Sequence, residues 1–151
     1  MLRVTKLADY GIVVMTHLAN RPGQWSARDI ARSACLPLPM VSKILKLLSR
    51  EGLLASHRGT KGGYSLSRPP EAITVADIIR ALEGPIAVTE CTDKVGDCDL
   101  ERLCPVRSNW HRINHAIRHA LEQITLSEMS HPFPERLVHL GDQQFESFRV
   151  S

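Results

Sequence analysis

Three cysteines that could hold an inorganic centre fall within one short stretch of the chain. Cys91, Cys98 and Cys104 are spaced C-x6-C-x5-C, with polar residues and Gly96 between them. Flexible spacers of this kind allow three thiolates to converge while the loop backbone stays hydrated. Three soft sulfur ligands suit zinc or an iron-sulfur cluster and leave one coordination position open. The stretch therefore predicts a metal centre with three protein thiolates.

The composition bounds what kind of protein can position such a centre. A chain of 151 residues, of which 43 % are apolar, can bury the core of one domain or of a small domain with an appended helix. The apolar run at residues 11–15 is too short to cross a bilayer, and the N-terminus lacks a signal-peptide pattern. We therefore expect a cytoplasmic protein with no membrane partner. In the cytoplasm, clustered cysteines bind metal or sense redox state more often than they form disulfides.

Charge is distributed unevenly along the chain. Residues 1–68 carry eleven Lys or Arg against three acids, whereas residues 69–151 carry eight against thirteen. A basic half joined to an acidic half indicates that the first half faces a polyanion. Chance clustering of solvated charge is the alternative interpretation.

The first fifty residues predict three helices. Apolar residues at three- and four-residue steps indicate a helix over residues 5–20, and Ser26 with Asp29 resembles a capping box at the start of a second helix. Pro39 can occupy the first turn of a third helix that runs to Arg50. Two short helices joined by a few residues, the second with a basic face, are typical of a helix-turn-helix.

A basic hairpin is predicted directly after these helices. Residues 53–56 and 64–67 read as two strands, and the glycine-containing turn between them carries Arg58 and Lys61. Together with the helix pair, this predicts a winged helix, so the fold class is mainly α with a small β-hairpin wing. A solvated hairpin that is basic by chance is the alternative.

The second half of the chain predicts a helix, the cysteine loop and a dimerisation helix. Thr74 and Asp77 start a short helix, and a long helix over residues 105–129 carries one apolar seam, which needs a partner. We expect it to pack in a homodimer; packing onto its own domain is the alternative. The predicted parts are a winged helix-turn-helix domain, a linker with the cysteine loop, the dimerisation helix and a poorly ordered tail: residues 1–84, 85–104, 105–129 and 130–151.

Several motifs together resemble one known family. Residues 53–64 (LLASHRGTKGGY), residues 78–84 (IIRALEG) and the cysteine loop are similar to the winged-helix iron-sulfur regulators of the IscR and NsrR (Rrf) family. The resemblance covers residues 1–129. Residues 1–11 (MLRVTKLADYG) and the segments at Glu90–Cys91 and 110–114 most resemble regulators of the SUF iron-sulfur assembly operon. Members of that branch are dimeric DNA-binding repressors whose cluster state controls operator affinity.

The resemblance implies a cofactor and its ligands. Cys91, Cys98 and Cys104 would hold an iron-sulfur cluster, with a 2Fe-2S cluster favoured over a 4Fe-4S cluster. IscR-type members carry a histidine three positions after the last cysteine, where this chain has Arg107. NsrR-type members use an aspartate from the first helix of the partner subunit, and Asp9 occupies the matching position. An exposed acid with no ligand role is the alternative for Asp9.

Two other groups of residues could bind metal but are expected to do something else. Cys35 stands apart from the loop and is expected to be a small buried apolar residue. His111, His115 and His119 share one helix face, and they are expected to be solvated beside the dimer seam rather than to chelate a metal. His111 is a weaker candidate for the fourth cluster position.

The winged helix predicts a set of DNA contacts. The exposed side of the third helix should enter the major groove, while the hairpin reaches the adjacent minor groove or backbone. The first two helices each add one phosphate contact. The predicted contacts are Lys6, Arg28, Ser42, Lys43, Lys46, Arg58 and Lys61.

The sequence therefore predicts a DNA-binding repressor of iron-sulfur assembly genes that is switched by its cluster and acts as a homodimer on double-stranded operator DNA. A nitric oxide or redox sensing regulator of the same family, a zinc or thiol sensor, and a cluster carrier that does not bind DNA are the alternatives. An enzyme is not expected, because no nucleophile with a base, nucleotide loop or supported carboxylate pair is present in the sequence.

Overall fold

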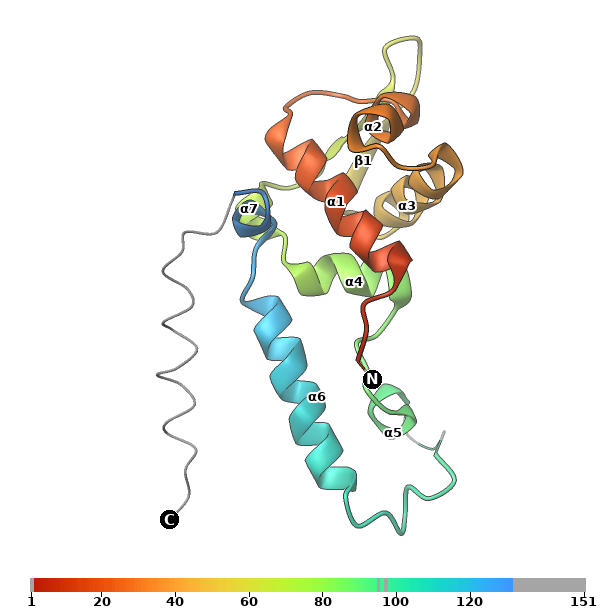
Figure 1. Cartoon of the computed structure of the whole chain (residues 1–151), viewed down its shortest axis with the longest axis vertical. Helices are drawn as coiled ribbons and strands as arrows, with labels where there is room; N and C mark the ends of the chain where they lie inside the picture. Colours follow the sequence, from red (N-terminus) through yellow and green to blue (C-terminus); the bar gives the residue numbers. More distant parts are fainter. Residues whose placement is uncertain (1, 95, 97, 132–151) are drawn as a thin grey trace.

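The computed structural model describes residues 2–94, 96 and 98–131 (Figure 1). It is mainly helical with one two-stranded antiparallel hairpin, which confirms the predicted fold class. The elements, in chain order, are α1 (Lys6–Asn20), α2 (Ala27–Ala34), α3 (Leu38–Arg50), β1 (Leu54–His57), β2 (Gly63–Leu66), the 3₁₀ helix η1 (Pro70–Ala72), α4 (Val75–Glu83), α5 (Glu90–Asp93), α6 (Arg107–Glu122) and α7 (Leu126–Met129).

Side-chain caps define the starts of α1, α2 and α4 in the winged domain. The hydroxyl oxygen of Thr5 accepts a hydrogen bond from Ala8 N–H at the start of α1, and Thr74 forms a capping box with Asp77 at the start of α4. Ser26 caps α2 by accepting from Asp29 N–H, but its own hydroxyl donates to the Asp29 carboxylate, so only half of the predicted capping box forms there.

The core lies between α1, α3 and α4. Met15, Ile44 and Ile78, one from each of these helices, are fully buried. Each buried side chain of this size stabilises the fold by about 1.5–3 kcal/mol relative to leaving it in water. This core fixes the position of the helix pair α2 and α3 on the rest of the domain.

The hairpin is attached to the helices through Trp25. Trp25 N–H donates to the carbonyl of Tyr64 at 3.0 Å, and Tyr64 N–H donates to the carbonyl of Trp25 at 2.8 Å. A Cβ atom on Gly63 would lie 2.6 Å from the Trp25 backbone, so this close approach requires glycine. Each strand is displaced by one residue from its predicted bounds, and Arg58 and Lys61 lie between the strands as predicted.

The predicted helix over residues 105–129 is wrong in its extent. α6 ends at Glu122, and a capping box at Thr125 and Glu128 starts α7. Leu126 is fully buried in the core of the winged domain, and its N–H donates to the carbonyl of Ile73 at 2.7 Å. Residues 124–129 therefore pack with the winged domain rather than extending α6. The predicted tail lies outside the described residues, except for residues 130 and 131.

α6 leaves much of its apolar side exposed. Val106, just before it, and Trp110 and Ile113 on it are exposed, and Asn114 is the one buried residue of the helix. In the part of the chain that the structure describes, no helix is both long enough and apolar enough to span a bilayer.

Candidate metal centre and nucleic-acid interface

The three cysteines of the loop lie at the end of the molecule opposite to α2, α3 and the hairpin (Figure 1). Cys91 lies on the short helix α5, which the sequence pattern did not predict, and is buried; Cys98 and Cys104 are half-buried. All three thiols are free. The Sγ atom of Cys91 is 3.2 Å from the Oγ1 atom of Thr89, so the first thiol already has one polar neighbour.

The three thiols share one loop, but they do not converge on one point. Among the described residues, no group of three His, Cys, Asp or Glu side chains is placed to hold a metal ion. Asp9 lies exposed on the first turn of α1 and belongs to no such group within its own chain. A metal would therefore require the loop to tighten around it.

An ion pair inside the loop, between the buried Glu101 and the partly exposed Arg107, was not predicted from the sequence. Glu101 is 7 % exposed, and its Oε1 atom lies 2.5 Å from Nη2 of Arg107, the first residue of α6. The other carboxylate oxygen of Glu101 accepts a hydrogen bond from Gly96 N–H. The only sequence signal was a Glu and an Arg in a polar loop, which is typical of solvated side chains.

The donor set of the loop fits a soft metal or an iron-sulfur cluster. Three free thiols supply the ligand type that such centres prefer. The Nε atom of Arg107 is buried and has no hydrogen-bond partner among the described residues. An unpaired N–H donor on a residue three positions after Cys104 suits a sulfur acceptor, and such hydrogen bonds tune cluster potentials.

α6 also holds the segment that leads into the loop. The Oδ1 atom of Asn114 accepts a hydrogen bond from Val88 N–H at 3.1 Å, and its Nδ2 atom donates to the carbonyl of Ile86 at 3.1 Å. The cysteine loop is therefore fastened to α6 on both sides, by Asn114 before Cys91 and by Arg107 after Cys104.

The remaining cysteine does not lie where it was expected. Cys35 is exposed, which corrects the prediction of a buried apolar residue. It ends α2 in the left-handed conformation, with φ of 54°, and its N–H bonds back to the carbonyls of Ala31 and Arg32. Because this backbone turn closes the helix, the side chain of Cys35 leaves the face that α2 buries.

The three histidines of α6 are exposed, as expected. The rings of His115 and His119 stack with their centroids 6.3 Å apart. Together with His111 they form no group placed to hold a metal ion in the described part of the chain.

Six of the seven predicted nucleic-acid contacts lie on α2, on α3 and in the turn of the hairpin, which are together at one end of the molecule (Figure 1), whereas Lys6 lies apart from them at the start of α1. Lys43 and Lys46 are exposed on α3, and Ser42 is half-buried. Arg28 on α2 and Lys6 at the start of α1 are exposed, as are the two basic residues between the strands, Arg58 and Lys61. The arrangement gives the basic half of the chain an open cationic surface.

A histidine lies where α1 meets the attachment of the hairpin. The ring of His17 packs edge-on against Trp25 with centroids 6.2 Å apart, and the Arg21 guanidinium lies 5.7 Å from the centre of the Trp25 ring. Burial, and secondly the charge of Arg21, lower the pKa of His17 from its ordinary value near 6.5. Its Nε2 atom is buried without a hydrogen-bond partner among the described residues.

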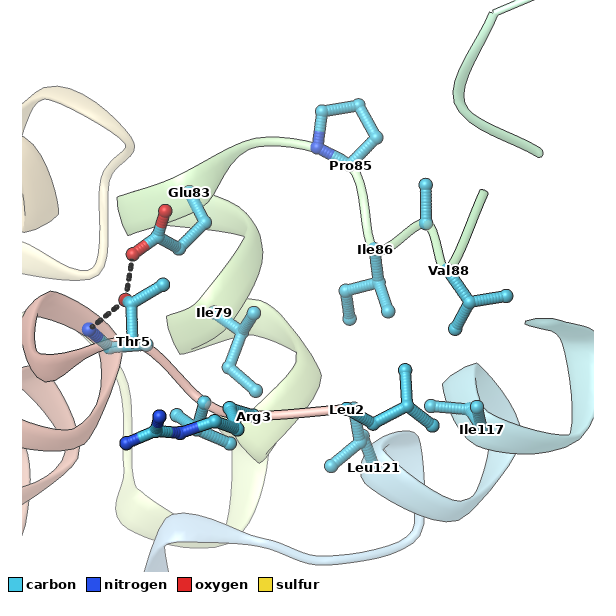
Figure 2. Close-up of a pocket in the computed structure, with 13 residues that line it drawn as sticks. Leu2, Arg3, Thr5, Ile79, Glu83, Pro85, Ile86, Val88, Ile117 and Leu121 are labelled. Carbon is cyan, nitrogen blue, oxygen red and sulfur yellow. Dashed lines mark hydrogen bonds between the residues drawn. The ribbon is translucent and has the colours of Figure 1, made fainter. Parts of the chain in front are cut away.

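An apolar pocket of about 300 Å³ lies between the N-terminal segment, α4 and α6 (Figure 2). Leu2 and Ile117 approach each other on one side, and Ile79 and Ile86 line it from α4 and from the linker. The Thr5 hydroxyl donates to the Glu83 carboxylate at its edge. Leu2 is 69 % exposed, so the pocket continues into an open apolar surface.

Comparisons with known proteins agree with this arrangement. The model of the Rrf2 family, described as an iron-dependent transcriptional regulator, matches residues 4–132. The HTH-type transcriptional regulator CymR of Bacillus subtilis is 34 % identical over 132 residues, which is 85 % of this chain and 90 % of CymR. The HTH-type transcriptional regulator IscR of Yersinia pseudotuberculosis is 29 % identical over 130 residues, which is 85 % of this chain and 79 % of IscR.

Solved structures give the same result. The structure of CymR, the global cysteine regulator of B. subtilis, superposes with a TM-score of 0.68 at 34 % identity, over 86 % of this chain and 97 % of CymR. The structure of T. potens IscR superposes with a TM-score of 0.64 at 30 % identity, over 99 % of this chain and 93 % of IscR. CymR and IscR are both named as regulators of transcription, and neither is named as an enzyme.

Proposed function

Because the chain belongs to the Rrf2 family of winged-helix transcriptional regulators, we propose that it represses iron-sulfur assembly genes and that an iron-sulfur cluster switches its affinity for operator DNA. One observation carries the proposal. Three free thiols lie in one loop that is fastened to α6 on both sides, at the end opposite to the basic winged helix. The protein acts in the cytoplasm, where the operator DNA is.

DNA recognition divides between the helix and the hairpin. The exposed side of α3, with Ser42, Lys43 and Lys46, enters the major groove, and Arg58 and Lys61 reach the adjacent minor groove or backbone. Arg28 and Lys6 contact phosphates.

The protein acts as a homodimer through the exposed apolar surface of α6 and the N-terminal segment. Trp110 and Ile113 on α6 expose large apolar side chains, and so do Leu2 and Val4, which line the apolar pocket together with Ile117 of α6. Exposed apolar surface of this kind marks an interface, and a second copy presents the same surface to it. Two copies then carry two recognition helices, which suit an operator with two half-sites.

Cys91, Cys98 and Cys104 would hold the cluster, and we assign the fourth position to Asp9 of a second copy. A 2Fe-2S cluster is favoured over a 4Fe-4S cluster, and either would supply a redox-active centre. A carboxylate is a hard ligand for iron held by thiolates, so the bond to Asp9 is the weak and exchangeable one. Because the loop is fastened to α6, a change at the thiols reaches the helix through Asn114 and Arg107.

The test is an absorption spectrum with iron and sulfide analysis after anaerobic purification, together with binding to operator DNA. The wild type should bind iron and sulfide and give the visible absorption of a cluster, and Cys98→Ser should lose it. Cys35→Ser, which changes an exposed thiol outside the loop, is the matched control and should keep the cluster. Asp9→Ala should keep the three thiolates but lose the cluster faster in air. A colourless, iron-free wild type after anaerobic reconstitution contradicts the proposal.

A family regulator that responds to thiols or redox state without a cluster is the second candidate. It is favoured by the similarity to CymR, whose structure is described as that of a cysteine regulator, and by the separation of the three thiols. A wild type that stays free of iron and sulfide, yet binds operator DNA in a manner that changes on thiol oxidation, supports this candidate instead.

A further inference from the structure

The ion pair between Glu101 and Arg107 joins two turns that each begin at a cysteine. Glu101 N–H donates to the carbonyl of Cys98 at 3.0 Å, and Arg107 N–H donates to the carbonyl of Cys104 at 3.4 Å. The 2.5 Å contact between the two side chains therefore links the turn that starts at Cys98 to the turn that starts at Cys104. The spacing between these two cysteines depends on that contact.

The same carboxylate also contacts the backbone of the loop just before Cys98. Gly96 N–H donates to Glu101 Oε2, and Gly96 has a φ of 96°, a conformation that favours glycine. One buried side chain thus contacts the backbone before Cys98 and the guanidinium after Cys104. No other ion pair between the described residues involves the cysteine loop.

Because Glu101 is buried, its ionised carboxylate is stabilised by the charge of Arg107. Glu101 is 7 % exposed, and among the described residues its Oε1 atom has no hydrogen-bond partner other than this charged contact. A buried carboxylate that loses the one cation it contacts among the described residues is unfavourable, so removing Arg107 favours loop conformations in which Glu101 is hydrated. The pair therefore helps to order the part of the loop that carries Cys98 and Cys104.

We propose that Glu101 and Arg107 are positioning residues that order the cysteine loop before the metal centre forms. The inference rests on the proposed function, since it takes the three thiols to be metal ligands. Neither residue donates an atom to the metal. By holding the turns at Cys98 and Cys104 together, the pair reduces the conformational entropy that three thiolates lose when they converge, and so it raises metal affinity.

The test compares Arg107→Met and Glu101→Gln with the control Arg102→Met, all reduced and free of metal. Arg102 is an exposed arginine of the same loop and forms no ion pair with any described residue. Two quantities are measured: amide hydrogen exchange over residues 96–104, and anaerobic binding of Co²⁺, whose thiolate charge-transfer absorption reports how many thiolates bind.

Arg107→Met should speed exchange in the loop about tenfold or more while the winged domain keeps its wild-type rates. It should weaken Co²⁺ binding by about 10–100-fold with the thiolate absorption per bound cobalt unchanged. Glu101→Gln leaves no unpaired buried carboxylate, so it keeps the measurement interpretable if Arg107→Met unfolds. Arg107→Lys, which keeps the charge, should recover most of the lost affinity.

The outcomes separate this inference from the proposed function. A wild type that binds neither Co²⁺ nor a cluster overturns the metal-binding role of the thiols, whatever the variants do. A wild type that binds Co²⁺ through three thiolates, with Arg107→Met and Glu101→Gln matching Arg102→Met in exchange and affinity, overturns the positioning role alone. Loss of thiolate absorption per cobalt in the variants would also contradict it, because the pair would then select which cysteines bind.

Discussion

The side chain of Asn114 holds the backbone of Val88, with the Oδ1 atom 3.1 Å from the Val88 amide nitrogen. The same side chain donates to the carbonyl of Ile86, so both polar ends of the amide bind the segment that precedes α5. Asn114 is 6 % exposed and lies on a helix that is otherwise solvated or half-buried. It joins the helix proposed to form the dimer to the segment that leads to Cys91.

Replacing Asn114 by Ala should lower the free energy of unfolding by about 2–4 kcal/mol, because Val88 N–H and the Ile86 carbonyl lose their shared partner while still partly buried. Urea unfolding followed by circular dichroism measures the change. Asn109→Ala, an exposed asparagine of the same helix, is the control and should change stability by less than about 0.5 kcal/mol. Equal effects of the two substitutions would show that the Asn114 contacts do not stabilise the fold.

Gly11 should be required for the close packing of α1 on α4. A Cβ atom on Gly11 would overlap Cδ1 of Leu82, which is buried in the core. Alanine favours a helix over glycine by about 1 kcal/mol, but overpacking costs about 1–3 kcal/mol, so Gly11→Ala should be destabilising by up to about 2 kcal/mol.

A double-mutant cycle checks this assignment. Leu82→Ala removes the obstructing side chain, so the cost of Gly11→Ala should disappear in that background and leave only the gain in helix propensity. If Gly11→Ala alone raises stability by about 1 kcal/mol, Leu82 moves aside without cost and the packing argument fails.

The free energy of unfolding should decrease in mild acid because His17 becomes protonated less readily in the folded protein than in the unfolded chain. Burial and the charge of Arg21 lower the pKa of His17 below its ordinary value near 6.5, so near and below that pH the unfolded chain binds more protons than the folded protein. The contribution of neutral His17 to the free energy of unfolding is fully present above pH 6.5, and it is lost as the pH falls through the lowered pKa of His17. His17→Gln should flatten this part of the stability profile, measured by urea unfolding between pH 5 and 8.

A control separates the effect of His17 from the effect of replacing any histidine. His115→Gln changes an exposed histidine of α6 and should leave the slope of the wild type unchanged. If the free energy of unfolding depends on pH in the same way for the wild type and for His17→Gln, the expected role of His17 is contradicted.

Local signals in the sequence were sufficient to predict the α-helices and the hairpin of residues 1–84. The caps at Ser26 and Thr74 depend on residues only three positions away, so they could be predicted from the sequence alone. α7 could not be, since the burial of Leu126 depends on pairing with Ile73, far away in the chain. The predicted helix therefore ran on to residue 129.

The cysteine loop shows the same limit for polar residues. Three cysteines in one loop were visible as a pattern, and the structure keeps them in that loop without bringing them together. Glutamate and asparagine side chains are usually solvated, and only tertiary contacts bury Glu101 and Asn114. Cys35 was predicted to be buried from its residue type, whereas the left-handed end of α2 exposes it.

Removing the charges of the hairpin should weaken DNA binding in a way that depends on salt. Each phosphate contact adds about 0.9 to the slope of log K against log salt concentration, and a homodimer carries two hairpins. Arg58→Gln combined with Lys61→Gln should therefore reduce the slope by up to about 4 if all four side chains contact phosphate.

Titration of labelled operator DNA by fluorescence anisotropy at several salt concentrations measures the slope. Lys94→Gln removes an exposed charge within the cysteine loop, which lies at the opposite end of the molecule, and should leave the slope unchanged. An unchanged slope in the hairpin variant, with affinity lost only for the specific operator, would instead assign Arg58 and Lys61 to base recognition.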